Sequence, residues 1–154
     1  MKLSTKGQYA VLALVDLAKH GDHGPVNLSD IAIRQDISQT YLEQLFGKLR
    51  RNGVVSSVRG PGGGYLLARP ADELCIADVI RAVDEAIQTT RCDSDSAIGC
   101  TGSSTRCLTH DLWDELARQI NVFLASITLA DVVDRNVIGK AGLMTDAPFA
   151  ERAL

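Results

Sequence analysis

One polar segment of the chain gathers side chains that can bind a metal. It contains Cys92, Cys100 and Cys107, separated by seven and six residues, and His110 follows the last cysteine after two more. The residues between them are mostly Gly, Ser, Thr and Asp, which favour loops and add little to a hydrophobic core. Thiols in such a loop are better explained by what they bind or how they react than by packing. Four soft or borderline ligands indicate a metal site.

Several chemistries remain open for these side chains. Structural zinc accepts three cysteines and a histidine, but its ligands usually come in close pairs, and no two cysteines here are separated by only two residues. An iron-sulfur cluster is held by thiolates, with histidine occasionally replacing one, and a single loop suits a cluster that can be lost. A regulatory disulfide would leave one of three thiols unpaired. Incidental cysteines explain the spacing worst.

Length and composition limit the kind of protein. The 154 residues can hold one ordinary core, or two small lobes that share a long helix. The N-terminus lacks a signal-peptide pattern and no apolar stretch approaches membrane-spanning length, so we expect a cytoplasmic protein without a membrane partner. Its thiols would stay reduced there, which favours metal or redox sensing over a disulfide framework. We find no P-loop and no nucleophile beside a partnered base, and we expect no enzyme.

Charge is distributed unevenly along the chain. Residues 1–70 contain nine Lys and Arg against five Asp and Glu, which gives +4, whereas residues 71–154 contain seven against fourteen, which gives −7. The two halves sum to the net charge of −3. The first half could therefore face a polyanion, and the overall acidity favours a few locally placed basic groups over indiscriminate coating of nucleic acid.

Periodicity predicts a helix-turn-helix in the first half of the chain. A mostly buried helix over residues 7–19 precedes a short helix over 28–34, a turn, and a second helix over 39–52. Two helices around so short a turn are typical of the motif that places its second helix in the major groove. The inward stripe of that second helix comprises Leu42, Leu45, Phe46 and Leu49.

The outward face of the same helix carries the predicted DNA contacts. We expect its N-terminal part to address base edges and its later basic residues to approach phosphates. The predicted contacts are Ser38, Gln39, Thr40, Tyr41, Glu43, Gln44, Lys48, Arg50 and Arg51.

Glu43 is an acidic residue on a face that must approach phosphates. It could complete a capping box with Thr40, three residues earlier. The functional alternative is a carboxylate that repels the DNA backbone unless it accepts a bond from a donor such as cytosine N4. Glu43 would then exclude sites that lack the donor.

A β-hairpin is predicted after the helix-turn-helix. Val54–Val58 alternates and is β-prone, Arg59–Gly64 is a flexible turn, and Tyr65–Ala68 returns as a second strand. Arg59 is the only cation at the tip, and the bare backbone from Gly60 onward can approach a groove closely. A hairpin in this place is a wing, and we expect Arg59 to enter the minor groove. The alternative is an exposed glycine loop with a solvated arginine.

The second half of the chain is predicted to link and dimerise. A helix over residues 76–85 follows Cys75, which lies among apolar neighbours and is interpreted as an inert core thiol. A long helix over 110–126, with Thr109 as a candidate N-cap, precedes a short helix over 128–133. A DNA-binding protein with one recognition helix usually dimerises, so that it can contact two half-sites. We therefore favour a helix that forms the dimer contact over one that packs on its own domain. Its predicted seam comprises Trp113, Leu116, Ile120, Phe123 and Ile127.

These patterns predict a mainly α fold with a small β-hairpin, in which a winged helix-turn-helix domain precedes a long dimerisation helix. The predicted divisions are 1–70 for the DNA-binding domain, 71–91 for a linking helix, 92–110 for the cluster-binding loop, 111–135 for the dimerisation and closing helices, and 136–154 for a disordered tail.

Blocks of residues throughout the chain resemble a known family. They are Leu3–Tyr9, Ile37–Ser38, Tyr41–Phe46, Asn52–Gly53, Val55–Leu67, Val79–Glu85, Arg91–Cys92, Cys107–His110 and Leu112–Trp113. Together they resemble the IscR family of iron-sulfur cluster regulators, which are winged-helix transcription factors, across roughly residues 2–133. The wing block and the Cys-Leu-Thr-His step are the specific parts, whereas a helix-turn-helix alone is not.

The resemblance implies a function and a ligand set. It implies a homodimer that binds palindromic operators in double-stranded DNA and regulates iron-sulfur assembly genes, mainly as a repressor. By position, one [2Fe-2S] cluster per subunit would be held by Cys92, Cys100, Cys107 and His110. Both gaps between cysteines are longer than the usual family pattern, which bears most on Cys100. Relatives with three cysteines and no matching histidine hold a [4Fe-4S] cluster, so that cluster and structural zinc are the alternatives.

Overall fold

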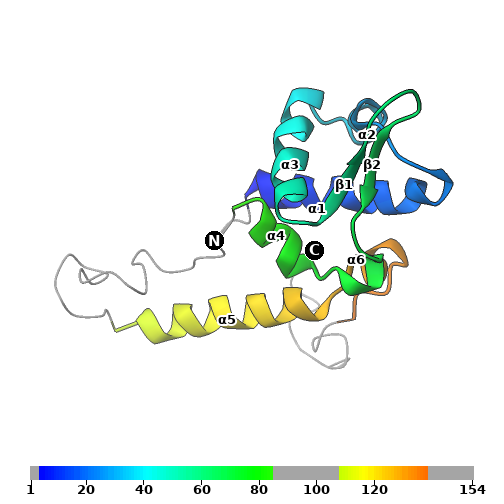
Figure 1. Ribbon diagram of the computed structural model, residues 1–154. Coiled ribbons are helices and arrows are strands. Elements are labelled where there is room, and N and C mark those ends of the chain that lie inside the picture. Colours follow the sequence, from blue (N-terminus) through cyan, green and yellow to red (C-terminus); the bar gives the residue numbers. More distant parts are fainter. Residues whose placement is uncertain (1–3, 85–107, 139–154) are drawn as a thin grey trace.

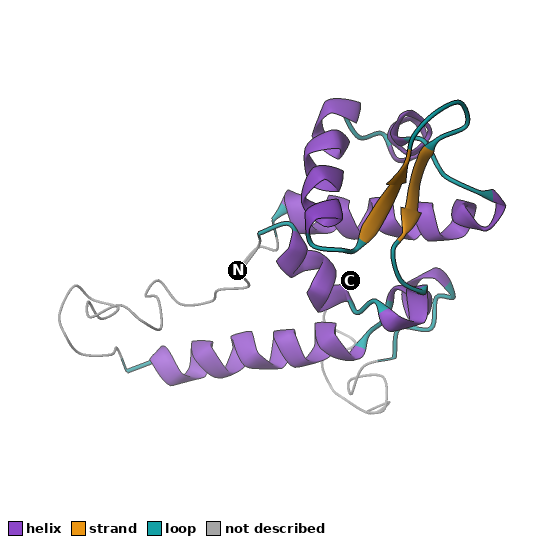
Figure 2. Ribbon diagram, in the orientation of Figure 1, coloured by secondary structure: helices purple, strands orange, loops and turns teal. Residues whose placement is uncertain are grey.

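The computed structural model describes residues 4–84 and 108–138. Its elements, in chain order, are α1 (Thr5–His20), α2 (Leu28–Gln35), α3 (Gln39–Arg51), β1 (Val55–Val58), β2 (Gly64–Leu67), α4 (Ile76–Ala82), α5 (His110–Ser126) and α6 (Leu129–Val133), with 3-10 turns at Gly21–His23 and Ala71–Glu73. The predicted mainly α fold with one β-hairpin is confirmed (Figures 1 and 2). We call α1–α3 and the hairpin the head.

Helix α1 lies across the head and receives the other elements on its apolar face (Figure 1). The Ser4 side chain accepts a hydrogen bond from the Lys6 amide at 3.2 Å and so caps the first turn. The face toward the core consists of Ala10, Ala13, Leu14 and Leu17, which are at most 1% exposed. Because two of these are alanines, neighbouring helices can approach α1 closely.

The turn between α2 and α3 is a tight corner. Asp36 ends α2 with a left-handed backbone (φ 52°), and the Ile37 amide then donates to the Ala32 carbonyl at 3.1 Å. Ile37 is 6% exposed and fills the space between the two helices, after which Ser38 stands at the N-cap of α3. This geometry turns the polar face of α3 outward.

A buried ion pair fixes α2 against α1. The Asp16 side chain on α1 is 1% exposed, and the Arg34 guanidinium on α2 reaches it with Nη2–Oδ1 at 2.6 Å and Nε at 3.0 and 3.1 Å from the two oxygens. Gln35 donates to the same carboxylate at 2.6 Å. Burial by itself would raise the pKa of Asp16, but the hydrogen bonds from Arg34 and Gln35 and the charge of Arg34 outweigh it, so the pKa lies below its ordinary value.

The hairpin is joined to the rest of the head through its second strand. β1 and β2 pair antiparallel, and Tyr65 also forms a bridge with Val26, with N···O distances of 2.9 and 2.8 Å. A side chain at Gly64 would collide with the Val26 carbonyl, so only glycine permits this approach. The Tyr65 ring also packs edge-on against Phe46 of α3, with centroids 5.0 Å apart. The orientation of the wing is thereby tied to α3.

A short backbone strip joins the start of α4 to the start of α6. The Ile76 amide donates to the Ile127 carbonyl at 2.9 Å, and the Leu129 amide donates to the Leu74 carbonyl at 2.8 Å. Between them, Cys75 pairs with Thr128. The Thr128 side chain and Asp131 then form a capping box on α6.

The hydrophobic core is continuous from the head to α4 and α6. It includes Leu74, Val79, Ile127 and Leu129 together with the apolar face of α1. One core thus crosses residue 70, the predicted end of the DNA-binding domain. The predicted domain divisions stay a prediction. Helix α5 instead extends away from the head, and its main contacts among the described elements are with α4 (Figure 1).

Three details differ from the sequence predictions. Helix α4 ends at Ala82 rather than at residue 85, because the chain turns there and Asp84 adopts a left-handed backbone (φ 57°). Cys75 is the half-buried N-cap residue of α4 instead of a core thiol. Ile127 is 5% exposed and belongs to the core, so it is not part of a dimer seam.

Candidate nucleic-acid interface and cluster ligands

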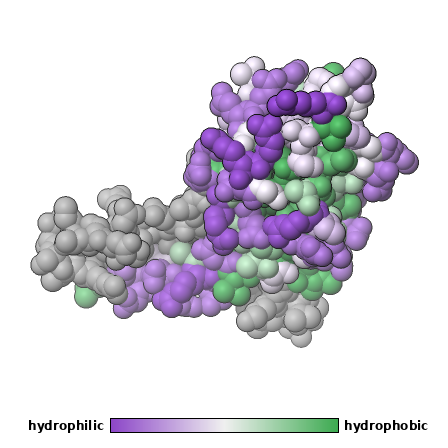
Figure 3. Space-filling model, in the orientation of Figure 1, coloured by the Kyte–Doolittle hydropathy of each residue, from purple (hydrophilic) through white to green (hydrophobic). Residues whose placement is uncertain are grey.

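The outward face of α3 is polar and exposed. Its apolar stripe is at most 2% exposed, as predicted, which leaves the opposite face open to solvent. Exposed residues on and just before that face are Ser38, Gln39, Thr40, Glu43, Gln44, Arg50 and Arg51. The surface over α3 is correspondingly hydrophilic in Figure 3. Tyr41 differs from these, because its half-buried ring packs edge-on against Tyr9 at the margin of the core.

Glu43 is held by Gln39 rather than by Thr40. Gln39 Nε2 donates to Glu43 Oε1 at 3.2 Å, an interaction one helical turn apart. The capping box considered for Thr40 is not formed, because α3 begins at Gln39 and Thr40 already lies inside the helix. The Glu43 carboxylate is therefore exposed on the outward face of α3, next to the Gln39 amide.

The C-terminal end of α3 is basic and is connected to its neighbours. Arg50 Nη1 donates to Ser57 Oγ on β1 at 3.4 Å, which links the helix to the wing. Arg51 Nε donates to the Gly47 carbonyl at 3.3 Å. Lys48 was predicted to point outward, but it is half-buried, and its Nζ lies 2.7 Å from Asp84 Oδ2.

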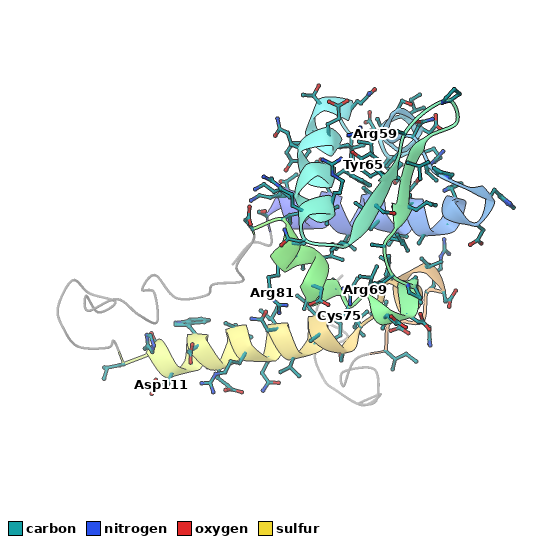
Figure 4. All side chains as sticks on the ribbon, viewed as in Figure 1. Arg59, Tyr65, Arg69, Cys75, Arg81 and Asp111 are labelled. Atoms are coloured by element: carbon teal, nitrogen blue, oxygen red, sulfur yellow. The ribbon has the colours of Figure 1, made fainter. Side chains whose placement is uncertain are left out.

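Arg59 lies at the end of the hairpin beside α3. Figure 4 shows it in that part of the head, with Tyr65 below it. Its side chain is exposed, and within the described part of the chain no hydrogen bond or ion pair holds the guanidinium. Gly60 follows with φ 104°, a conformation that side chains avoid. The arginine is thus presented by a bare turn, as the sequence predicted.

The predicted cluster ligands are only partly described. His110 is the first residue of α5, follows Thr109 at the predicted N-cap position, and is 8% exposed. Cys92, Cys100 and Cys107 lie outside the described residues. No group of three or more side chains that could hold a metal ion occurs among residues 4–84 and 108–138, and the ligand set stays a prediction.

Helix α5 exposes much of its apolar seam. Trp113 and Phe123 are 43% and 41% exposed, and Leu116 and Ile120 between them are half-buried. The spacing of three, four and three residues places these four side chains along one side of the helix. Among the described elements, α5 packs mainly against α4.

The sequence analysis did not predict two contacts between elements. Asp16 interrupts the apolar stripe of α1, and a charge in that position requires a cation partner, which is the one signal that pointed toward Arg34. The pairing of Lys48 with Asp84 spans 36 residues, and no local pattern could have indicated it.

A helix-turn-helix followed by a wing defines a winged-helix DNA-binding protein. The family model described as "Rrf2: Iron-dependent Transcriptional regulator" matches residues 3–135. The chain belongs to the Rrf2 family and is a transcriptional regulator rather than an enzyme.

Relatives and solved structures agree with this assignment. The chain is 54% identical over 143 residues to the "HTH-type transcriptional regulator IscR" of Photorhabdus laumondii, covering 92% of this chain and 85% of that one. It is 56% identical over 133 residues to the protein of the same name from Xenorhabdus nematophila, covering 86% and 79%.

Among solved structures, T. potens IscR matches with a TM-score of 0.71 and 40% identity, covering 88% of each chain. CymR, described as the global cysteine regulator of B. subtilis, matches with a TM-score of 0.72 and 32% identity, covering 88% of this chain and 98% of that one. Within the described residues, no helix is both long and apolar enough to cross a membrane.

Proposed function

We propose that the protein is an iron-sulfur-cluster-sensing regulator that binds palindromic operators as a homodimer and controls, mainly by repression, genes for iron-sulfur cluster assembly. The observation that carries the DNA part is the exposed polar face of α3 standing beside the free arginine of the wing. The regulated genes and the cofactor are what the resemblance to the IscR family implies, and relatives that carry the IscR name match at more than half identity. Such a regulator acts on the chromosome, so we place it in the cytoplasm.

We propose that Cys92, Cys100, Cys107 and His110 hold one [2Fe-2S] cluster per subunit. Three thiolates and an imidazole are a donor set that suits such a cluster, and [4Fe-4S] or zinc are the alternatives. His110 supports this role, because it is buried where the positive end of the α5 dipole favours an anionic group. A bound cluster supplies a redox-sensitive, removable charge at that position.

Visible absorption of the anaerobically purified protein tests the cofactor. A [2Fe-2S] protein is reddish-brown, whereas a zinc protein is colourless. Alanine at Cys92, Cys100 or Cys107 should abolish or strongly weaken the chromophore, and Cys75→Ala is the matched control that should leave it intact. Because histidine must lose its proton to ligate, the cluster should be more acid-labile than one held only by thiolates. Retention of the full spectrum in His110→Cys would remove the histidine from the ligand set.

For the DNA face, we propose that α3 enters the major groove and Arg59 the minor groove. Base-edge contacts would come from the N-terminal part of α3, and phosphate contacts from its basic end. The proposed contacts are Ser38, Gln39, Thr40, Tyr41, Glu43, Gln44, Lys48, Arg50, Arg51, Arg59 and the backbone of Gly60. Arg59→Ala should weaken specific binding by about 1–3 kcal/mol in a titration at fixed salt. An unchanged affinity would exclude the wing from recognition.

Glu43 is proposed to discriminate between operators. Its exposed carboxylate penalises sites that offer it no donor, and its bond to Gln39 shows that an amide can satisfy it. Glu43→Ala should let cluster-free protein bind cluster-dependent sites more tightly, with little loss at the others. Affinities of apo and cluster-loaded protein on both kinds of site decide the matter. Equal weakening everywhere would contradict discrimination.

We propose that the α5 seam forms the homodimer contact. The exposed Trp113 and Phe123 support this, because large aromatic side chains on one side of a protruding helix gain most from burial against a second copy. The heads of the two subunits would then face the two half-sites of a palindromic operator.

A further inference from the structure

An ion pair joins the basic end of α3 to the end of α4. Lys48 Nζ donates to Asp84 Oδ2 at 2.7 Å. The Lys48 side chain is 31% exposed and the Asp84 side chain is 70% exposed. The pair is therefore open to solvent and to any polyanion that approaches the end of α3.

The Asp84 carboxylate is presented by a well-held turn. Asn52 Nδ2, at the C-cap of α3, donates both to the Lys48 carbonyl and to the Ala82 carbonyl, each at 3.0 Å. The Lys6 ammonium donates to the Asp84 carbonyl at 3.5 Å, and the Asp84 amide donates to the Arg81 carbonyl at 3.1 Å. The left-handed backbone at Asp84 (φ 57°) is one that Asp and Asn tolerate better than other side chains.

One cation contacts this carboxylate, and two more act on it through their charges. The hydrogen bond from Lys48 and then its charge lower the pKa of Asp84, and the charges of Lys6 and Arg51 act in the same direction against a small opposing effect of burial. Asp84 is therefore ionised at neutral pH. Two of these cations, Lys48 and Arg51, belong to the basic end of α3 that is proposed to meet the DNA backbone.

We propose that Asp84 sets the affinity of the protein for DNA, because its carboxylate competes with a backbone phosphate for Lys48. This inference rests on the DNA face proposed above. While Lys48 is paired with Asp84, the protein neutralises fewer phosphates and releases fewer counterions on binding. Asp84 thus weakens a sequence-independent contact and leaves base readout to carry a larger share of the affinity.

Salt-dependent binding of the full chain tests the competition. The probes are a duplex selected from random sequence for binding to the wild-type protein, and a second duplex of unrelated sequence. Asp84→Asn, which keeps the shape and tolerates the backbone, should tighten binding to both duplexes about two- to fivefold, the range expected for freeing one exposed ion pair. The slope of log affinity against log salt should steepen by up to about 0.9, the value for one additional phosphate.

The matched control is Asp78→Asn, which removes the same charge from α4. Asp78 pairs with Arg81 at 3.0 Å and with Arg69 at 3.8 Å. Figure 4 shows both arginines on the side of α4 toward α5, away from the wing tip. Asp78→Asn should leave the salt slope unchanged. If it tightened binding as much as Asp84→Asn, the effect would be one of net charge and the inference would be wrong.

The Lys48→Ala background separates this inference from the proposed DNA face. Lys48→Ala should weaken binding to both duplexes, and Asp84→Asn should then have no further effect. Weakening by Lys48→Ala with no gain from Asp84→Asn would overturn the competition and leave the DNA face standing. If Lys48→Ala had no effect on binding, the competition and the proposed DNA contact at this end of α3 would both be wrong. Matching thermal unfolding curves for all variants exclude a change in folding as the cause.

Discussion

The head and α5 differ in the burial of their large apolar side chains. In the head, the four apolar residues of α3 are 0–2% exposed and meet α1, α2 and the hairpin within the same chain. On α5, Trp113 and Phe123 are more than 40% exposed, and His110 is the only residue of the helix that is fully buried. The apolar face of α3 is covered within the chain, whereas α5 leaves two large aromatic side chains exposed to solvent.

The ion pairs of the two regions also differ in how far they are buried. Asp16 and Arg34 are joined across α1 and α2 with one partner fully buried. Arg118 on α5 pairs with Asp114 and Glu115 at 2.9 and 3.5 Å, and all three side chains are at least half exposed. Buried pairs hold a geometry and are costly to break, while exposed pairs add little. Stability should therefore depend on the head, and assembly on α5.

The largest expected effect follows from breaking the buried pair. Arg34→Ala leaves the Asp16 carboxylate buried, with Gln35 as its hydrogen-bond donor and His20 Nδ1 at 3.5 Å, and it should lower the free energy of unfolding by about 3–5 kcal/mol. The control is Arg118→Ala on α5, which should cost at most about 1 kcal/mol. Urea denaturation of the two variants measures both values. Similar losses would contradict the contrast between the two regions.

A smaller effect should appear as acid destabilisation of the head. The pKa of Asp16 is lower in the folded protein, so its stabilisation is fully present above the unfolded-state value of about 3.9 and is lost as the pH falls through the folded-state pKa. Asp16→Asn should be less stable than wild type at neutral pH, and the difference should shrink below about pH 4. Urea midpoints across this range measure the difference. A constant difference at every pH would show that charge is not its source.

The smallest effect on folding should come from α5, together with the largest effect on assembly. Phe123→Ala should change the free energy of unfolding of the head by no more than about 0.5 kcal/mol, because the side chain lies outside the core. Its sedimentation should shift from dimer toward monomer at micromolar concentration. Arg118→Ala, on the opposite side of the helix, should sediment as wild type does. A dimer unaffected by Phe123→Ala would move the contact away from this seam.

The sequence predicted the elements better than the contacts between them. Within the described residues, apolar periodicity located each α-helix and strand within a few residues, because burial of one face is a local property of the sequence. It could not show that Lys48 turns toward Asp84, since that contact depends on where α4 ends and how Asn52 holds the turn. It also misjudged Glu43, because a capping box depends on which residue begins the helix, and that residue is Gln39.

In the candidate site, too, local features were predicted from the sequence and other features were not. The outward face of α3 and the bare turn after Arg59 followed from residue types and spacing. The ligand set came from the resemblance to the IscR family, and within the described residues the structure adds only the burial of His110. The membership in the Rrf2 family supports the regulator as a whole without assigning its individual contacts.

The backbone strip between α4 and α6 has a consequence for how the cysteine segment can evolve. Leu74 and Leu129 are joined through the backbone, 55 residues apart in the chain, and both side chains belong to the core. Loop-closure entropy grows only with the logarithm of length, at about 0.6 kcal/mol for each doubling, so a few inserted residues cost the fold very little. Insertions between the cysteines are thus nearly free for the helices on either side, and if these cysteines hold the proposed cluster, the cluster rather than the fold would select their spacing.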